Sequence, residues 1–126
     1  MIIRTLALSL AVAACAPASA KTPPPANKYD VMVAAPDHYK VRVDNDHVRV
    51  VENILPAGAK DGMHTHAAGW YYVTRPGTMK VVHQDGKVVM WEAKAGEAGW
   101  MEAEAPHTSE NVGTGEMGFV LVEVKR

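Results

Sequence analysis

Apolar and polar residues alternate along most of the chain after about residue 38. In a β-strand successive side chains point to opposite faces, so this alternation predicts strands with one buried face. No stretch of ten or more residues keeps helical spacing without a Gly or Pro, apart from the first twenty residues. The segments that carry the strand pattern are residues 39–43, 47–54, 70–74, 79–83, 87–91, 100–102 and 117–124. Strands separated by turns at this spacing predict a single all-β domain, built as a sandwich or a small barrel.

One of the predicted turns has a specific sequence signal. Asp85 and Gly86 lie between the segments 79–83 and 87–91. Asp-Gly is typical of tight hairpins because both residues tolerate positive φ. We therefore expect these two segments to pair as an antiparallel hairpin.

The first twenty residues have the pattern of a secretory signal peptide. Arg4 precedes an apolar stretch at residues 6–14, and Ala18-Ser19-Ala20 supplies small residues for cleavage. Cys15 follows Val-Ala-Ala, which resembles the lipobox of bacterial lipoproteins. Two alternatives stay open: cleavage after Ala20, or a lipid on Cys15 that anchors the domain to a membrane. Either one predicts an exported protein that is periplasmic or faces the periplasm.

Length and composition limit the remaining possibilities. The chain of 126 residues suits one domain, here residues 38–126, preceded by a Pro-rich tether at residues 21–37. Its net charge is −1 and no basic patch is visible, so nucleic acid is not an expected partner. Cys15 is the only cysteine, which excludes disulfides and thiol catalysis from the folded domain.

Three of the six histidines indicate a metal site. His64 and His66 are two residues apart, so an extended backbone points both rings to one face. His107 follows Pro106, and a strand that begins there can return beside the first pair. Imidazoles in this arrangement bind divalent Fe, Mn, Zn or Ni. The alternative is a solvated pair without an ion. The remaining histidines are expected to face solvent rather than bind metal: His38, His47 and His83.

The region around His64 resembles the first motif of the cupin superfamily, in which Gly, His-x-His, Glu and Gly follow at fixed spacing. The positions that match are Gly58, His64, His66 and Gly77. The position of the motif glutamate is occupied by Trp70, or by Tyr71 under the longer permitted spacing.

The second cupin motif ends in His, three residues and Asn, and His107 and Asn111 match that ending. Pro106 is also present, although the part of the motif before His107 is shortened. The resemblance spans roughly residues 58 to 111, and it implies a single-domain jelly-roll barrel in which His64, His66 and His107 converge.

The resemblance also implies that the usual carboxylate ligand is missing. Glu102 or Glu104, in the segment before His107, is a candidate for a substitute fourth ligand. Since Trp70 replaces a residue that points into the barrel, we expect it to form an apolar wall for a substrate. Tyr72 lies on the same face and is a candidate substrate-binding residue and acid or base. Trp100 is a further candidate for substrate binding.

Three functions are compatible with this resemblance. The first is a metal-dependent enzyme, related to the three-histidine dioxygenases, isomerases or lyases, that acts on a small organic molecule. The second is a periplasmic binding or sensing module that holds a small ligand or a metal without turnover. The third is a structural or accessory protein, with a homodimer as the expected assembly. Turnover separates the first two, and stoichiometric metal separates both from the third.

Overall fold

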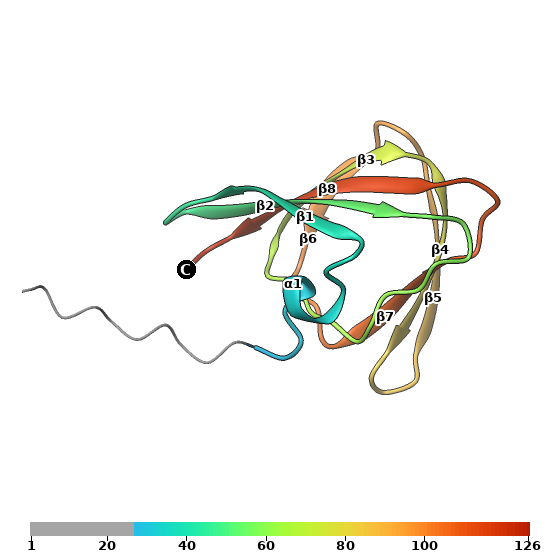
Figure 1. The fold of residues 1–126 in the computed structure, drawn as a ribbon, viewed down its shortest axis with the longest axis horizontal. Helices are drawn as coiled ribbons and strands as arrows, with labels where there is room; N and C mark the ends of the chain where they lie inside the picture. The colour runs from blue at the N-terminus through green and yellow to red at the C-terminus, as the bar shows by residue number, and fades with distance from the viewer. Residues whose placement is uncertain (1–26) are drawn as a thin grey trace, which may run out of the picture.

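The computed structural model describes residues 27–126, which form two antiparallel β-sheets that face each other (Figure 1). This part of the chain has one short helix and eight strands. The elements are α1 (Val31–Ala34), β1 (Tyr39–Asp44), β2 (Val48–Leu55), β3 (Gly69–Arg75), β4 (Gly77–His83), β5 (Val88–Ala93), β6 (Ala98–Met101), β7 (His107–Asn111) and β8 (Met117–Val124). The predicted all-β barrel is therefore confirmed.

The two sheets are connected in the manner of a jelly roll. The larger has the strand order β1-β2-β8-β3-β6, and the smaller has the order β5-β4-β7. The chain first passes from the larger sheet to the smaller between Arg75, the last residue of β3, and Gly77, the first of β4. A single proline, Pro76, separates these strands.

The core lies between the sheets and is formed by every second residue of the strands. In β8 the buried positions are Met117, Phe119 and Leu121, and in β2 and β3 they include Val51 and Val73. Burying a side chain of this size stabilises the fold by about 1.5–3 kcal/mol. In β2, β3 and β8 the period-two pattern in the sequence is thus the pattern of burial, whereas most residues of β1 and β5 are exposed.

The hairpin between β4 and β5 forms where the Asp-Gly pair predicted it. Gly86 has φ of 87°, which is the left-handed conformation that glycine adopts without strain. Its N–H donates to the carbonyl of His83 at 2.9 Å, and the carboxylate of Asp85 accepts from the N–H of Lys87 at 2.9 Å.

A segment before the barrel packs against it, and we call residues 29–35 the N-terminal strap. Val31 and Ala35 in the strap belong to the buried core. Asp30 caps α1 by accepting a hydrogen bond from the N–H of Met32 at 2.9 Å. The prediction of a tether over residues 21–37 is therefore wrong for the strap, because the burial of two apolar side chains holds it on the barrel.

The predictions for the first 26 residues lie outside the described residues. They include the signal peptide at residues 1–20, the lipobox at Cys15 and the first part of the tether. Within residues 27–126, no helix is long and apolar enough to cross a membrane.

Candidate metal centre

His64 and His66 lie in the irregular segment between β2 and β3, which runs alongside β7. His64 and His107 form an antiparallel bridge in which each N–H donates to the other residue's carbonyl at 2.9 Å. The same two segments are joined a few residues away, where the N–H of Asp61 donates to the carbonyl of Ser109 at 2.8 Å. Backbone pairing thus brings together histidines that are distant in sequence.

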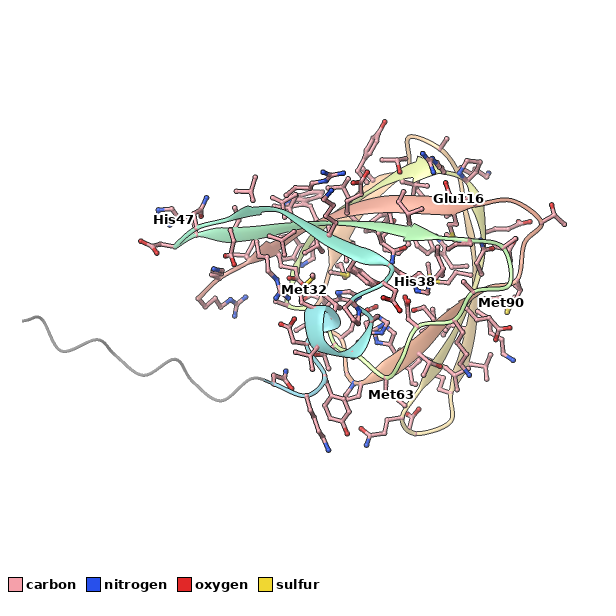
Figure 2. The ribbon with its side chains drawn as sticks, in the orientation of Figure 1. Met32, His38, His47, Met63, Met90 and Glu116 are labelled. Carbon is pink, nitrogen blue, oxygen red and sulfur yellow. The ribbon has the colours of Figure 1, made fainter. Side chains whose placement is uncertain are left out.

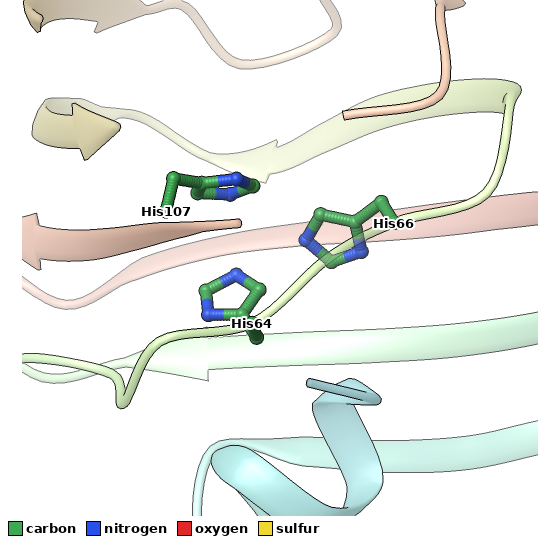
Figure 3. Close-up of side chains that lie close together, drawn as sticks. All are labelled: His64, His66 and His107. Atoms are coloured by element: carbon green, nitrogen blue, oxygen red, sulfur yellow. The ribbon is translucent and has the colours of Figure 1, made fainter. Parts of the chain in front are cut away.

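The three predicted histidines form one buried cluster (Figure 3). One ring nitrogen from each of His64, His66 and His107 lies within 4.8 Å of the others. The ring centroid of His64 is 4.5 Å from that of His107 and 4.9 Å from that of His66. The three side chains come from two segments and turn toward a common point, so the cluster predicted from the sequence is present.

Hydrogen bonds at Nδ1 orient each ring of the cluster. The Nδ1 of His64 is 2.7 Å from the carbonyl of Gly62, and that of His107 is 2.8 Å from the carbonyl of Ala105. The Nδ1 of His66 is 3.3 Å from a carboxylate oxygen of Glu123. Carbonyls and carboxylates only accept, so Nδ1 carries the proton and Nε2 keeps its lone pair.

This arrangement fits a metal ion. Ligating histidines in metalloproteins use one ring nitrogen for the ion and donate the other N–H to a carbonyl or carboxylate. The Nε2 of His64 is buried and has no hydrogen-bond partner among the described residues. A buried polar atom without a partner is costly, and an ion at the centre of the cluster would satisfy it.

The cluster also favours neutral imidazoles, which is the form that binds metal. Burial, together with the neighbouring His66, lowers the pKa of His64 to about 3. Burial likewise lowers the pKa of His107. Both rings are therefore unprotonated at neutral pH.

Of the two glutamates considered as a fourth ligand, Glu104 lies beside the cluster. Its carboxylate is 3.3 Å from the Nε2 of His107. Two atoms that bind one ion at about 2.1 Å each are roughly 3–3.4 Å apart at ordinary coordination angles, so this separation fits a shared ion. Glu102 instead accepts a hydrogen bond from the indole N–H of Trp100 at 2.8 Å on the exposed surface.

A cavity of about 380 Å³ adjoins the cluster. Its polar end includes His66, His107 and Glu104, together with the buried Tyr39. The ring of Tyr39 lies 5.8 Å from that of His64 and 5.9 Å from that of His66. The cavity's other lining residues are mainly apolar or aromatic: Tyr71, Met79, Val81, Trp91, Trp100, Met101, Glu102, Ala103, Ser109, Phe119 and Leu121.

Trp70 and Tyr72 do not line this cavity, and the prediction that they point into the barrel is wrong. Their side chains are 54% and 50% exposed on the outer face of β3. Alternation along β3 explains the difference, because Tyr71 and Val73 point inward and their neighbours must then point outward. Trp100 does reach the cavity, and its ring packs edge-on against that of Trp70 at 5.7 Å.

Tyr71 takes the inward place that we expected for Trp70. Its hydroxyl donates to the carboxylate of Glu97 at 3.1 Å, and the indole N–H of Trp91 donates to the same carboxylate at 3.2 Å. The two rings meet edge-on at 5.4 Å. The longer spacing of the first cupin motif, which selects Tyr71, was the sequence signal for this residue.

The other histidines are not members of the cluster. His47 is exposed at the turn between β1 and β2, as expected (Figure 2). His38 and His83 are half-buried rather than solvent-facing. The Nδ1 of His38 is 2.5 Å from a carboxylate oxygen of the buried Asp61, and burial raises the pKa of that carboxyl. The ring of His83 lies 5.8 Å from that of His107.

Asn111, the last residue of the second motif, joins the end of β2 to the segment between β7 and β8. Its side-chain amide donates to the carbonyls of Leu55 and Gly115, each at 2.8 Å. Its side-chain oxygen accepts from the N–H of Gly113 at 3.0 Å. The contacts of Asn111 are therefore structural.

Sequence reasoning missed Glu123, which contacts His66 from the last strand. Burial alone would raise the pKa of Glu123, but hydrogen bonds from His66 and Arg49 outweigh it and lower the pKa. The only signal in the sequence was a single carboxylate among the apolar residues of β8.

These features define a class of protein: a two-sheet antiparallel barrel with a buried three-histidine cluster beside a cavity. No protein-family model matches the sequence, and no curated protein matches it. Solved structures do. The chain is similar to a cupin domain from Bordetella pertussis, with 25% identity and a TM-score of 0.64, over 70% of this chain and 92% of that one.

Two further solved structures show the same fold. One is an RmlC-like cupin with a double-stranded β-helix fold from Methanocaldococcus jannaschii, at 16% identity and a TM-score of 0.56, covering 68% of this chain and 77% of that one. The other is the polyketide cyclase RemF from Streptomyces resistomycificus, at 20% identity and a TM-score of 0.52, covering 68% and 65%. The described domain is a small single-domain cupin in its fold, as the sequence motifs predicted.

Proposed function

We propose that this protein is a metal-dependent enzyme that binds one divalent ion through His64, His66 and His107. Its substrate is a small organic molecule that occupies the adjacent cavity. The observation that carries the proposal is the orientation of the three rings in a buried cluster. Each Nδ1 is engaged, the Nε2 of His64 has no partner among the described residues, and the Nε2 of His107 faces the carboxylate of Glu104. The candidate ions are Fe, Mn, Zn and Ni.

The residues of the chain have separate tasks in this proposal. A bound ion supplies Lewis acidity or, for iron, a site for oxygen chemistry. The backbone carbonyls and Glu123 hold the histidine rings. Glu104 lies close enough to the cluster to bind the ion or to accept a proton from the substrate. Trp100 and Tyr71 supply aromatic surface to the substrate.

The cavity supports a small and partly apolar substrate. Its volume of about 380 Å³ lies within the range of small-molecule sites. Apolar side chains such as Met79, Phe119 and Leu121 form much of its wall, and polar groups gather at the end that holds His66 and His107. A molecule with one polar end would place that end toward the metal.

Elemental analysis of the full chain, purified without an affinity tag, tests this proposal. We expect about one divalent ion per chain, either as purified or after reconstitution with Fe²⁺, Mn²⁺, Zn²⁺ or Ni²⁺. The reconstituted protein is then assayed against a panel of small carbonyl and phenolic compounds. Stoichiometric metal with ligand binding but no conversion would favour the non-catalytic binding module. Absence of stoichiometric metal in every preparation would refute the metal site.

We also propose that the protein is exported, on the strength of the sequence of residues 1–20 alone. Cell fractionation tests this, since intact protein that retains Met1 in the cytosol would contradict it. Cys15→Ala separates the two forms of export, because it abolishes membrane association only where Cys15 carries a lipid. The homodimer stays a prediction.

A further inference from the structure

A chain of charged side chains connects the N-terminal strap to the metal centre. The Nδ1 of His66 is 3.3 Å from one carboxylate oxygen of Glu123. The other oxygen of Glu123 accepts from Nε of Arg49 at 2.6 Å. The guanidinium of Arg49 also donates to the carboxylate of Asp30 in the strap, at 2.7 Å. These contacts run without a break from the strap to a candidate metal ligand.

The position of Glu123 in β8 is unusual for a carboxylate. It continues the inward row of Met117, Phe119 and Leu121, and only 2% of its surface is exposed. Arg49 is its register partner on β2. Burying the charge of Glu123 costs free energy unless both of its oxygens are paired. One oxygen accepts from the half-buried Arg49, and the other is directed at His66.

The strap also contacts the segment that carries His64 and His66. Thr65, between the two histidines, donates its N–H to the carbonyl of Tyr29 at 2.8 Å. Gly62 lies so close to the strap that a Cβ there would come within 2.6 Å of the carbonyl of Ala34. Figure 1 shows α1 next to the segment that joins β2 and β3.

We propose that Glu123 is a positioning residue that orients His66 for metal binding, and that Arg49 and Asp30 link this orientation to docking of the strap. This inference rests on the proposed metal site. A carboxylate that accepts from Nδ1–H fixes the tautomer and rotation of the ring and makes Nε2 a stronger donor. Because the strap holds Arg49 and the backbone of Thr65, metal binding and strap docking stabilise each other. Such coupling is reciprocal by thermodynamic linkage.

The test compares Glu123→Gln and Glu123→Ala with the wild-type full chain. Glutamine keeps the size of the side chain but loses its charge. The glutamine variant therefore keeps the test possible if the alanine variant does not fold. The matched control is Glu52→Gln, since Glu52 pairs with Arg42 on the neighbouring strands without contact to a histidine. Co²⁺ serves as the probe, because its absorption spectrum reports the ligands and their geometry as well as the affinity.

We expect Glu123→Ala to weaken Co²⁺ binding about 10–100-fold, as for other outer-sphere partners of ligating histidines, and to alter the spectrum. Glu123→Gln should lose less, and Glu52→Gln should match the wild type. In metal-free protein at pH 8, ¹⁵N NMR should show the Nδ1–H tautomer of His66 in the wild type and a tautomer mixture in Glu123→Ala. A folded Glu123→Ala protein with wild-type Co²⁺ affinity, spectrum and tautomer would overturn the proposal.

Asp30→Ala tests the link to the strap. We expect a loss of Co²⁺ affinity of a few-fold, and a smaller metal-induced slowing of hydrogen exchange at the amides of residues 33–35 than in the wild type. Equal slowing in both proteins would overturn the coupling. If the wild-type chain binds no divalent ion, both the proposed function and this inference are wrong. If the wild-type chain and the Glu123 variants bind the ion equally well, only this inference is wrong.

Discussion

The two faces of the five-stranded sheet carry different kinds of side chain. On the inner face, Phe119 and Leu121 are followed by the buried Glu123, which pairs with the half-buried Arg49. On the outer face, the aromatic rings of Trp70 and Tyr72 are about half exposed. The charged pair therefore lies on the inner side of the sheet, beside the cavity, whereas the outer side carries two half-exposed aromatic rings. Burying a polar group costs free energy, and such groups are retained where they serve a functional site. The polar groups on the inner face therefore indicate where the functional site lies.

The largest effect inside the barrel should come from the three histidines of the cluster. His64→Ala, His66→Ala and His107→Ala should each weaken metal binding by more than about 100-fold, beyond the range seen for outer-sphere partners, because one of three nitrogen donors is lost. His47→Ala, at the exposed turn, should bind metal as the wild type does. Isothermal titration with Zn²⁺ measures both. Metal loss in His47→Ala but not in the cluster variants would show that the site is elsewhere.

A second comparison uses neighbouring residues of β8 that point to opposite faces. Leu121→Ala removes a side chain that is 3% exposed and should destabilise the domain by about 2–5 kcal/mol. Val122→Ala changes a half-buried position on the outer face and should cost less than about 1 kcal/mol. Urea unfolding of the metal-free proteins measures the difference. Equal losses would mean that the outer face is covered in solution.

Acid should destabilise the metal-free protein through the buried His64. The pKa of His64 is about 3 in the folded state against an ordinary value of 6.5. Between these values the unfolded chain binds a proton that the folded chain excludes, so stability falls as pH falls. From pH 7.5 to pH 5 the loss should be up to about 2 kcal/mol from this residue. His64→Gln should show a shallower pH dependence in urea unfolding, and an unchanged slope would contradict the assignment.

The strands and the histidine cluster could be predicted because their signals are local or motif-based. The alternation of β8 gave its bounds, and the Asp-Gly pair gave the β4–β5 hairpin. The cupin motifs paired His64 with His107 across forty residues. Each of these predictions rested on residue spacing, which the sequence displays directly.

The rest could not be predicted because it depends on side-chain direction and on contacts between distant segments. A motif position that allows two spacings cannot decide between Trp70 and Tyr71, since a shift of one residue reverses the face of a strand. The apolar residues of the strap form one short unbroken run, residues 31–35, which shows neither a strand period nor a helical one. The sequence therefore does not reveal that Val31 joins the core. The contact between Glu123 and His66 joins residues 57 positions apart, which no local signal reports.

The smallest expected effect concerns Trp70, which stands where the cupin motif places its glutamate. Because Trp70 lies on the outer face, Trp70→Glu adds a solvated carboxylate rather than a metal ligand. The variant loses the edge-on contact with Trp100, which is worth about 0.5–1.5 kcal/mol, and gains a favourable exposed charge. We therefore expect a small drop in melting temperature and unchanged affinity for Mn²⁺, measured on the same sample. A carboxylate inside the barrel would instead bind the ion and raise Mn²⁺ affinity, because hard divalent ions prefer anionic oxygen ligands. A rise in Mn²⁺ affinity would thus place residue 70 inside and reverse the comparison between the two faces of β3.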